Sequence, residues 1–144
     1  WSANPSLIDG SSDVLKTTMF NKLAIANSKL APYGLAAEQV LDQLGLLNSS
    51  RSKWVQGENI AQTYQFVETG NSDLGFVAKS QVWKNGRLIS GSAWDIPTEL
   101  YSPIKQDIVI LIWWPLAHRL CRPIIRIYKF IYSVSACAFI NCLI

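Results

Sequence analysis

LAIANSKLAPYGLAAEQVL, residues 23–41, is the stretch that decides the fold. It opens with an apolar run, Leu23 to Ala26, which stops at the polar Asn27 and is typical of a short buried strand. A helical pattern follows from Pro32, since its apolar residues recur at spacings of three and four: Ala37, Val40, Leu41 and Leu44. Proline is tolerated at a helix start, where its missing N–H has no partner in any case, and Gly45 is well placed to end the helix.

The same order of elements returns further along the chain. Trp54–Val55 is a possible short strand, and Gly57 to Asn59 lead into a second helix whose apolar positions are Ile60, Ala61, Tyr64 and Val67. That helix ends at Gly70, and residues 74–78 (LGFVA) form another apolar strand. Alternating short strands and amphipathic helices predict an α/β domain, with a short mixed sheet flanked by helices.

The remaining segments carry weaker patterns. Residues 1–21 are rich in turn signals, with one helical turn expected near Asp13. We further expect a polar loop over 48–53, a short helix or turn over 81–87 with Asn85-Gly86 as a breaker, and strands over 94–96 and 107–112.

The two helix starts share one design that suggests a chemistry. In residues 31–34 and again in 57–60, a loop of small or turn-forming residues feeds an amphipathic helix. The first N–H groups of a helix have no partner within it, and the helix dipole adds partial positive charge there, so such an end can bind an anion without lysine or arginine. The alternative is that both are ordinary helix starts, capped by water or by Asn59.

Four stretches resemble, in order and in spacing, a known family of proteins. They are residues 23–41, VQGENIAQTYQFV at 55–67, TGNSDLGFVA at 69–78 and LYSPIKQDIV at 100–109. Together they resemble the periplasmic molybdate-binding proteins, which are the receptors of molybdate ABC importers. The resemblance covers residues 1–111, and Trp1-Ser2 is similar to the end of the segment that joins the two lobes in that family.

The resemblance implies a lobe of the type II periplasmic-binding class, hinged to a second lobe, with the oxyanion in the cleft between them. It implies that the backbone N–H groups of Tyr33 and Ile60 are this lobe's two donors. Around them it places four supporting residues: Pro32, Gly34, Glu58 and Asn59.

It also implies two differences from the intact family. Some members add a tyrosine hydroxyl from the third strand, and that position is Ala78 here. The other half of the site comes from serine, threonine or asparagine in a first lobe, which we expect to precede Trp1. We therefore predict that this lobe alone binds its oxyanion weakly or not at all.

The predicted function is binding of molybdate or tungstate and delivery to an ABC permease from the periplasm, without a cofactor. We predict no enzyme activity, because no histidine precedes His118 to activate a nucleophile. Sulfate is an alternative ligand. Two further alternatives stay open: the effector-sensing domain of a transcription regulator, which shares the fold, and a nonfunctional product of a truncated gene.

The last part of the chain, residues 112–144, departs from everything before it. It holds four basic residues and no acid, whereas residues 1–112 hold nine basic and all ten acidic residues, so the net charge of +3 comes from this tail and does not indicate nucleic-acid binding. It also holds His118 and the three cysteines Cys121, Cys137 and Cys142, without the paired spacing of a zinc site.

We interpret the tail as a frameshifted end. A membrane anchor is the alternative and would be the chain's one membrane contact, but residues 130–144 are shorter than the roughly 20 apolar residues that a span needs.

Overall fold

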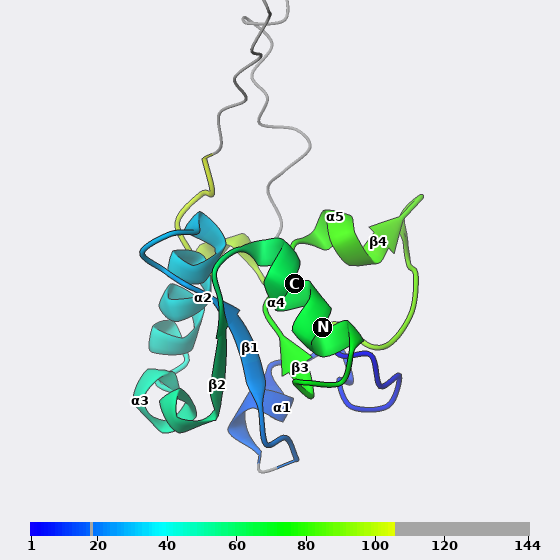
Figure 1. The fold of residues 1–144 in the computed structure, drawn as a ribbon, viewed down its shortest axis with the longest axis horizontal. Coiled ribbons are helices and arrows are strands. Elements are labelled where there is room, and N and C mark those ends of the chain that lie inside the picture. Colours follow the sequence, from blue (N-terminus) through cyan, green and yellow to red (C-terminus); the bar gives the residue numbers. More distant parts are fainter. Residues whose placement is uncertain (18, 106–144) are drawn as a thin grey trace, which may run out of the picture. The chain divides into compact units, whose positions relative to one another are not determined.

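A computed structural model describes residues 1–17 and 19–105, and Trp1–Ile104 lie in one compact unit (Figure 1). The predicted strand over 107–112, the boundary predicted after residue 111 and the tail over 112–144 lie outside the described residues.

The described elements alternate between helices and strands. In chain order they are α1 (Asp13–Lys16), β1 (Leu23–Ala26), α2 (Pro32–Gln43), α3 (Leu47–Ser50), a 3-10 turn (Arg51–Lys53), β2 (Trp54–Gly57), α4 (Ile60–Glu68), β3 (Leu74–Gly75), α5 (Lys79–Val82), β4 (Trp83–Lys84), β5 (Arg87–Leu88) and a second 3-10 turn (Thr98–Leu100). Within residues 1–17 and 19–105, no helix is long and apolar enough to cross a bilayer.

Three strands form a parallel sheet in the order β2-β1-β3. All four residues of the central strand β1 are buried, as expected for a parallel strand that is covered on both faces. The chain moves from β1 to β2 on one side and then back across β1 to β3 on the other. Because such crossovers are right-handed, this reversal puts α2 and α4 on opposite faces of the sheet, and Figure 1 shows the two helices on different sides of β1.

Several predictions from the sequence are confirmed. The helical turn at Asp13, the strand Leu23–Ala26 and the two amphipathic helices lie where the patterns put them. Gly45 and Gly70 follow the helix ends with φ of 70° and 76°, the left-handed conformation that glycine adopts readily. The α/β class is confirmed as well, with antiparallel pairing between Ser2 and Ser92 beside the parallel strands.

Other predictions are wrong or confirmed only in part. Residues 48–53 are not an open loop, because serine hydroxyls bond back to the preceding turn (Ser49 Oγ to Leu46 O, 3.1 Å) and hold short helical turns. The prediction of a short helix or turn over 81–87 is confirmed in part, because Gln81 and Val82 end α5 and Asn85-Gly86 forms a turn with positive φ at both positions. The pairing of the flanking residues as the β4–β5 hairpin was not predicted.

Two predicted strands are shorter or missing. Strand β3 ends at Gly75, and residues 94–96 form no ladder although Ile96 is buried. Ile96 fills the core without strand pairing, while Asp95 is exposed, which explains this error.

The first two residues are bound into the fold beside β3. Trp1 and Gly75 exchange backbone hydrogen bonds of 3.0 and 2.9 Å, and the Trp1 indole stacks on Tyr64 at 5.1 Å. Burial lowers the pKa of the Trp1 amino group to about 5. Gly91 passes so close to Ser2 that a Cβ would lie 3.0 Å from the Ser2 carbonyl carbon, so this crossing requires glycine.

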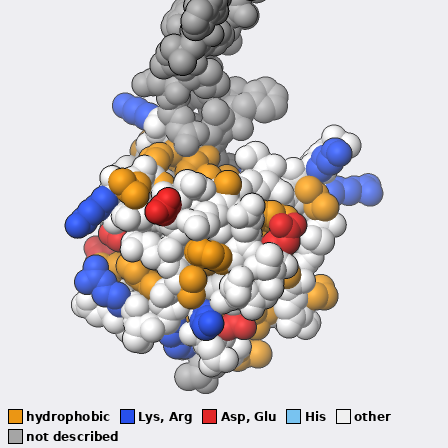
Figure 2. All heavy atoms as spheres, in the orientation of Figure 1, with side chains coloured by type: hydrophobic (Ala, Val, Ile, Leu, Met, Phe, Trp, Pro, Cys, Tyr) orange, Lys and Arg blue, Asp and Glu red, His pale blue; other side chains and the backbone are white. Residues whose placement is uncertain are grey.

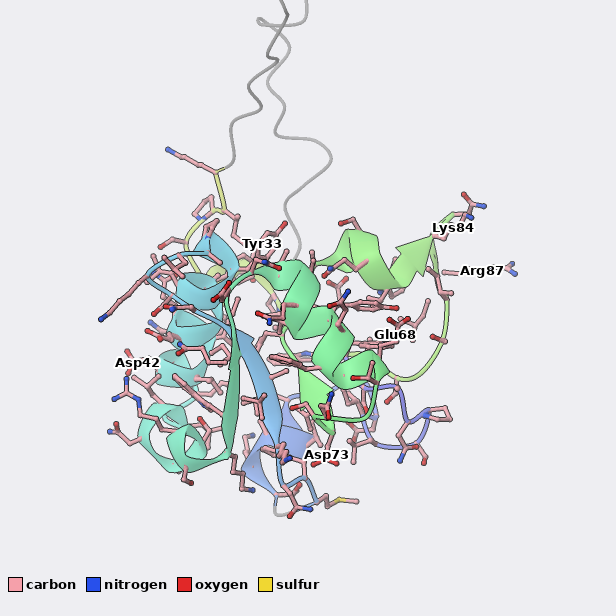
Figure 3. All side chains as sticks on the ribbon, viewed as in Figure 1. Tyr33, Asp42, Glu68, Asp73, Lys84 and Arg87 are labelled. Carbon is pink, nitrogen blue, oxygen red and sulfur yellow. The ribbon has the colours of Figure 1, made fainter. Side chains whose placement is uncertain are left out.

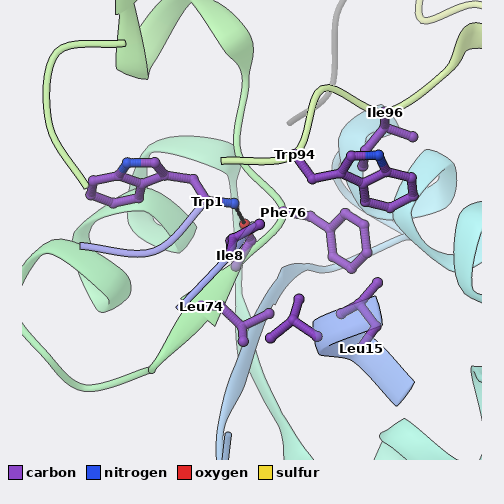
Figure 4. A pocket seen from close by; sticks show the side chains of 9 residues that line it. Trp1, Ile8, Leu15, Leu74, Phe76, Trp94 and Ile96 are labelled. Atoms are coloured by element: carbon purple, nitrogen blue, oxygen red, sulfur yellow. Dashed lines mark hydrogen bonds between the residues drawn. The ribbon is translucent and has the colours of Figure 1, made fainter. Parts of the chain in front are cut away.

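A small apolar cavity of about 20 Å³ lies beneath this segment, lined among others by Leu15, Phe76 and Trp94 (Figure 4). That volume is close to one water molecule, and its apolar lining is typical of a gap in the core.

Candidate anion-binding site

The carboxyl ends of β1 and β2 lie side by side at one edge of the sheet. Ala26 is in register with Gly57, and the Asn27 amide donates to the Gly57 carbonyl at 2.7 Å. The helices that follow these two neighbouring strands lie on opposite faces of the sheet. In open parallel sheets, such a reversal opens a crevice outside the strand ends, where ligands bind.

Both predicted donors lie in the segments that leave this edge. Tyr33 is the second residue of α2, and Ile60 is the first residue of α4. Figure 3 shows Tyr33 at the end of the molecule from which the two helices begin. Tyr33 is buried, at 4% exposure, so its side chain is not open to a ligand at the edge.

The start of α2 is built by backbone contacts. The Asn27 carbonyl accepts from the amides of Leu30 (3.0 Å) and Ala31 (2.8 Å), which winds the loop into a turn. The N-cap residue, Ala31, has no side-chain oxygen, so no side chain caps the first turn. Pro32 is exposed at the first helical position.

Gly34 lets the first turn of α2 pack tightly against the end of β1. A Cβ at Gly34 would lie 2.7 Å from the Ser28 amide nitrogen and closer still to the carbonyl oxygen of Ala26. Real Cβ atoms do not approach backbone so closely. The close approach that explains this glycine is therefore to the chain's own strand end.

The start of α4 is built by side chains instead. Asn59 Oδ1 accepts from the Gln62 amide (2.9 Å), and the Asn59 carbonyl accepts from the Thr63 amide (3.1 Å). Gln62 Oε1 in turn accepts from the Glu58 amide (2.7 Å). The amides of Ile60 and Ala61 precede Gln62 and Thr63, the first amides with an acceptor in this turn, so they point out of the end of the helix.

Gln81 is a contributor that the sequence patterns did not identify. Its Nε2 donates to the Ile60 carbonyl (3.3 Å), and its Oε1 accepts from the Ala78 amide (2.9 Å). A polar residue on a half-buried turn leaves no periodic signal. Ala78, the position of the tyrosine in some family members, is buried at the start of α5.

Charges are distributed in a way that suits an anion at this edge. Asp42 and Glu68 lie at the far ends of α2 and α4, and Asp73 precedes β3, so all three lie toward the opposite edge (Figure 3). Glu58 is the exception, because it lies next to the N-cap of α4 with its side chain exposed. On the face in Figure 2 the charged side chains are dispersed, and residues 1–17 and 19–105 hold no cluster of histidine, cysteine or carboxylate that could bind a metal ion.

These features define an α/β ligand-binding lobe with two helix starts at a switch point of a parallel sheet. A family model described as bacterial extracellular solute-binding protein matches residues 1–113. The chain belongs to this family of extracellular solute-binding proteins.

Two curated relatives are similar to the chain. One, named molybdate-binding protein ModA from Azotobacter vinelandii, is 57% identical over 111 residues, which are 77% of this chain and 44% of the relative. The other, of the same name from Rhodobacter capsulatus, is 48% identical over 112 residues, 77% of this chain and 42% of the relative. The chain thus spans less than half the length of each.

Two solved structures are also similar to this chain. The periplasmic molybdate-binding protein of Azotobacter vinelandii matches with a TM-score of 0.68 and 38% identity, over 72% of this chain and 46% of that one. The substrate-binding domain of a putative molybdenum ABC transporter from Clostridium difficile matches with a TM-score of 0.58 and 27% identity, over 72% and 43%. These relatives do not favour the alternative of a regulator's sensing domain.

Proposed function

We propose that this chain is one lobe of a periplasmic receptor that binds molybdate or tungstate and delivers it to an ABC permease. The amides of Tyr33 and Ile60 donate to the oxyanion. Pro32 and Gly34 shape the first helix start, and Glu58 and Asn59 shape the second. The role is binding by hinge closure over the anion, without a catalytic step or a cofactor.

One observation supports this proposal above the others. Two helix starts leave neighbouring strand ends toward opposite faces, in a chain 57% identical to a protein named for molybdate binding. Neutral amides suit a tetrahedral dianion because they stabilise its charge through the helix dipole and hydrogen bonds, with no fixed cation to favour another anion. Molybdate and tungstate have nearly the same size and charge, so both fit the proposal.

The affinity expected of this lobe alone is low. Two amide hydrogen bonds to an anion contribute about 3–6 kcal/mol before the costs of ordering, and a millimolar dissociation constant corresponds to about 4 kcal/mol. We therefore expect a millimolar or weaker constant by calorimetry. A micromolar constant would contradict this estimate.

Nuclear magnetic resonance tests the donors directly, because every substitution except proline leaves the backbone amide in place. Titration of the ¹⁵N-labelled chain with sodium molybdate should move the Tyr33 and Ile60 amide signals most. Sodium chloride at equal ionic strength is the control. Shifts confined to other residues would reject the site, and equal shifts with sulfate would reject selectivity for molybdate.

The Ile60 amide can also be deleted. Ile60 is the first residue of α4, where proline is tolerated, and Asn59 is extended (φ −147°, ψ 171°), as a residue before proline should be. We expect Ile60→Pro to weaken molybdate binding about tenfold relative to Ile60→Ala, which loses the same side chain but keeps the N–H. Equal affinities would show that this amide is not a donor.

A further inference from the structure

Gln81 connects the third strand end to the start of α4. It lies in α5, 21 residues from Ile60, and uses both ends of its amide side chain: Nε2 on the Ile60 carbonyl and Oε1 on the Ala78 amide. A side-chain amide that is engaged at both ends holds two backbone segments in a fixed relation. Here the segments follow β2 and β3.

The hydrogen bond from Gln81 Nε2 is made to the peptide group that joins Ile60 and Ala61. The Ile60 carbonyl and the Ala61 N–H belong to the same peptide, so a donor on that carbonyl fixes the direction of that N–H and increases its polarity. On the other side of Ile60, Asn59 closes the first turn through Gln62 and Thr63. Gln81 and Asn59 therefore hold Ile60 from both sides.

We propose that Gln81 is a positioning residue of the anion site, which keeps the first two amides of α4 aimed at the shared edge of the sheet. This inference rests on the proposed function. The ligand class is a tetrahedral oxyanion bound by the Ile60 amide, with the Ala61 amide beside it. Gln81 acts through the backbone of α4 and does not itself bind the anion.

Other contacts anchor α5 without Gln81. The next residue, Val82, is buried at 2% exposure in the core cluster with Trp1 and Val67, and Lys79 pairs with Asp95. Loss of the Gln81 amide should therefore change the start of α4 while α5 stays in place.

The decisive variant is Gln81→Met, which keeps the length of the side chain and removes both hydrogen bonds. Gln65→Met, at an exposed position on α4, is the matched control. In the ligand-free chain we expect the Ala61 and Ala78 amide signals to move in Gln81→Met and not in the control. Molybdate affinity measured by the same titration should fall about three- to tenfold, with urea unfolding close to that of the control.

A second variant separates positioning from mere folding. Gln81→Glu keeps an acceptor for the Ala78 amide. It also places a carboxylate oxygen against the Ile60 carbonyl, so the hydrogen bond to that carbonyl is lost. Lowering the pH protonates the introduced carboxyl and restores a donor, so the Ala61 signal should return toward its wild-type position. An Ala61 signal that ignores this protonation would overturn the proposal.

The outcomes distinguish failure of the proposed function from failure of the proposed role of Gln81. If molybdate leaves the wild-type Tyr33 and Ile60 signals unmoved, the proposed function fails, and the role of Gln81 toward an anion fails with it. If they move but Gln81→Met binds like the control, Gln81 is not a positioning residue and the proposed function stands. If Gln81→Met loses affinity only in proportion to unfolded chain, its role is structural.

Discussion

The starts of α2 and α4, at the shared edge of the sheet, are held in place by different kinds of contact. Backbone contacts hold the start of α2: the Asn27 carbonyl closes the loop, Gly34 packs on the strand end, and the N-cap is an alanine. Side chains hold the start of α4, through Asn59, Gln62 and Gln81. A helix start can therefore be held by close steric packing or by a network of side-chain hydrogen bonds. Substitutions at the two starts should accordingly change stability and binding in different ways.

The largest expected effect comes from a methyl group at each start. Gly34→Ala drives a Cβ into the backbone at Ala26 and Ser28, which cannot yield without moving the strand. At Gly57 a Cβ would lie 2.9 Å from the Thr63 hydroxyl and 3.1 Å from the Thr63 amide nitrogen, contacts that are less severe than those at Gly34. We expect Gly34→Ala to cost at least about 3 kcal/mol and Gly57→Ala about 1 kcal/mol in urea unfolding. Equal losses of unfolding free energy in the two variants would show that the two helix starts do not differ in steric fit.

An exchange of caps should have a smaller effect. Asn59→Ala removes the α4 cap and should cost about 1 kcal/mol of stability. Ala31→Ser supplies α2 with a side-chain acceptor for the Tyr33 amide and should raise stability by about 0.5–1 kcal/mol. The same serine competes with the anion for that amide, so molybdate affinity should fall while the melting temperature rises. A serine that changes stability and affinity in the same direction would show that Tyr33 does not donate.

The smallest effect concerns charge. Glu58 lies beside the α4 start, and Glu68 ends the same helix at the opposite edge. Glu58→Gln should tighten molybdate binding about twofold at low ionic strength, and the gain should vanish in about 0.5 M salt because exposed charges are screened. Glu68→Gln is the control and should leave affinity unchanged. A gain at Glu58 that persists in high salt would point to a direct contact.

The sequence predicted the elements better than their arrangement. Strand β1 is a continuous apolar run and helices α2 and α4 carry the helical period, and each lies where its apolar residues put it. The reversal of strand order that brings the two helix starts to one edge depends on which strands pair, and no local pattern encodes that pairing. The hairpin around Asn85-Gly86 was missed for a related reason, since a turn signal does not say whether two strands flank it.

The site itself was predictable only in part. Family resemblance singled out Tyr33 and Ile60, and the fold puts their segments at one edge of the sheet. Gln81 was not predicted from the sequence, because its proposed role depends on a contact with a residue 21 positions away. Gly34 was expected to support the site, and the structure explains it by close packing on Ala26 and Ser28.

A recognition surface made of peptide groups would be nearly invisible to alanine scanning. Replacing Ile60 by alanine leaves its N–H in place, and replacing the buried Tyr33 by alanine would report the loss of a core side chain while that N–H also stays in place. A survey of side chains would therefore not test the amides. The informative survey substitutes proline, glycine and backbone esters, which act on the main chain itself.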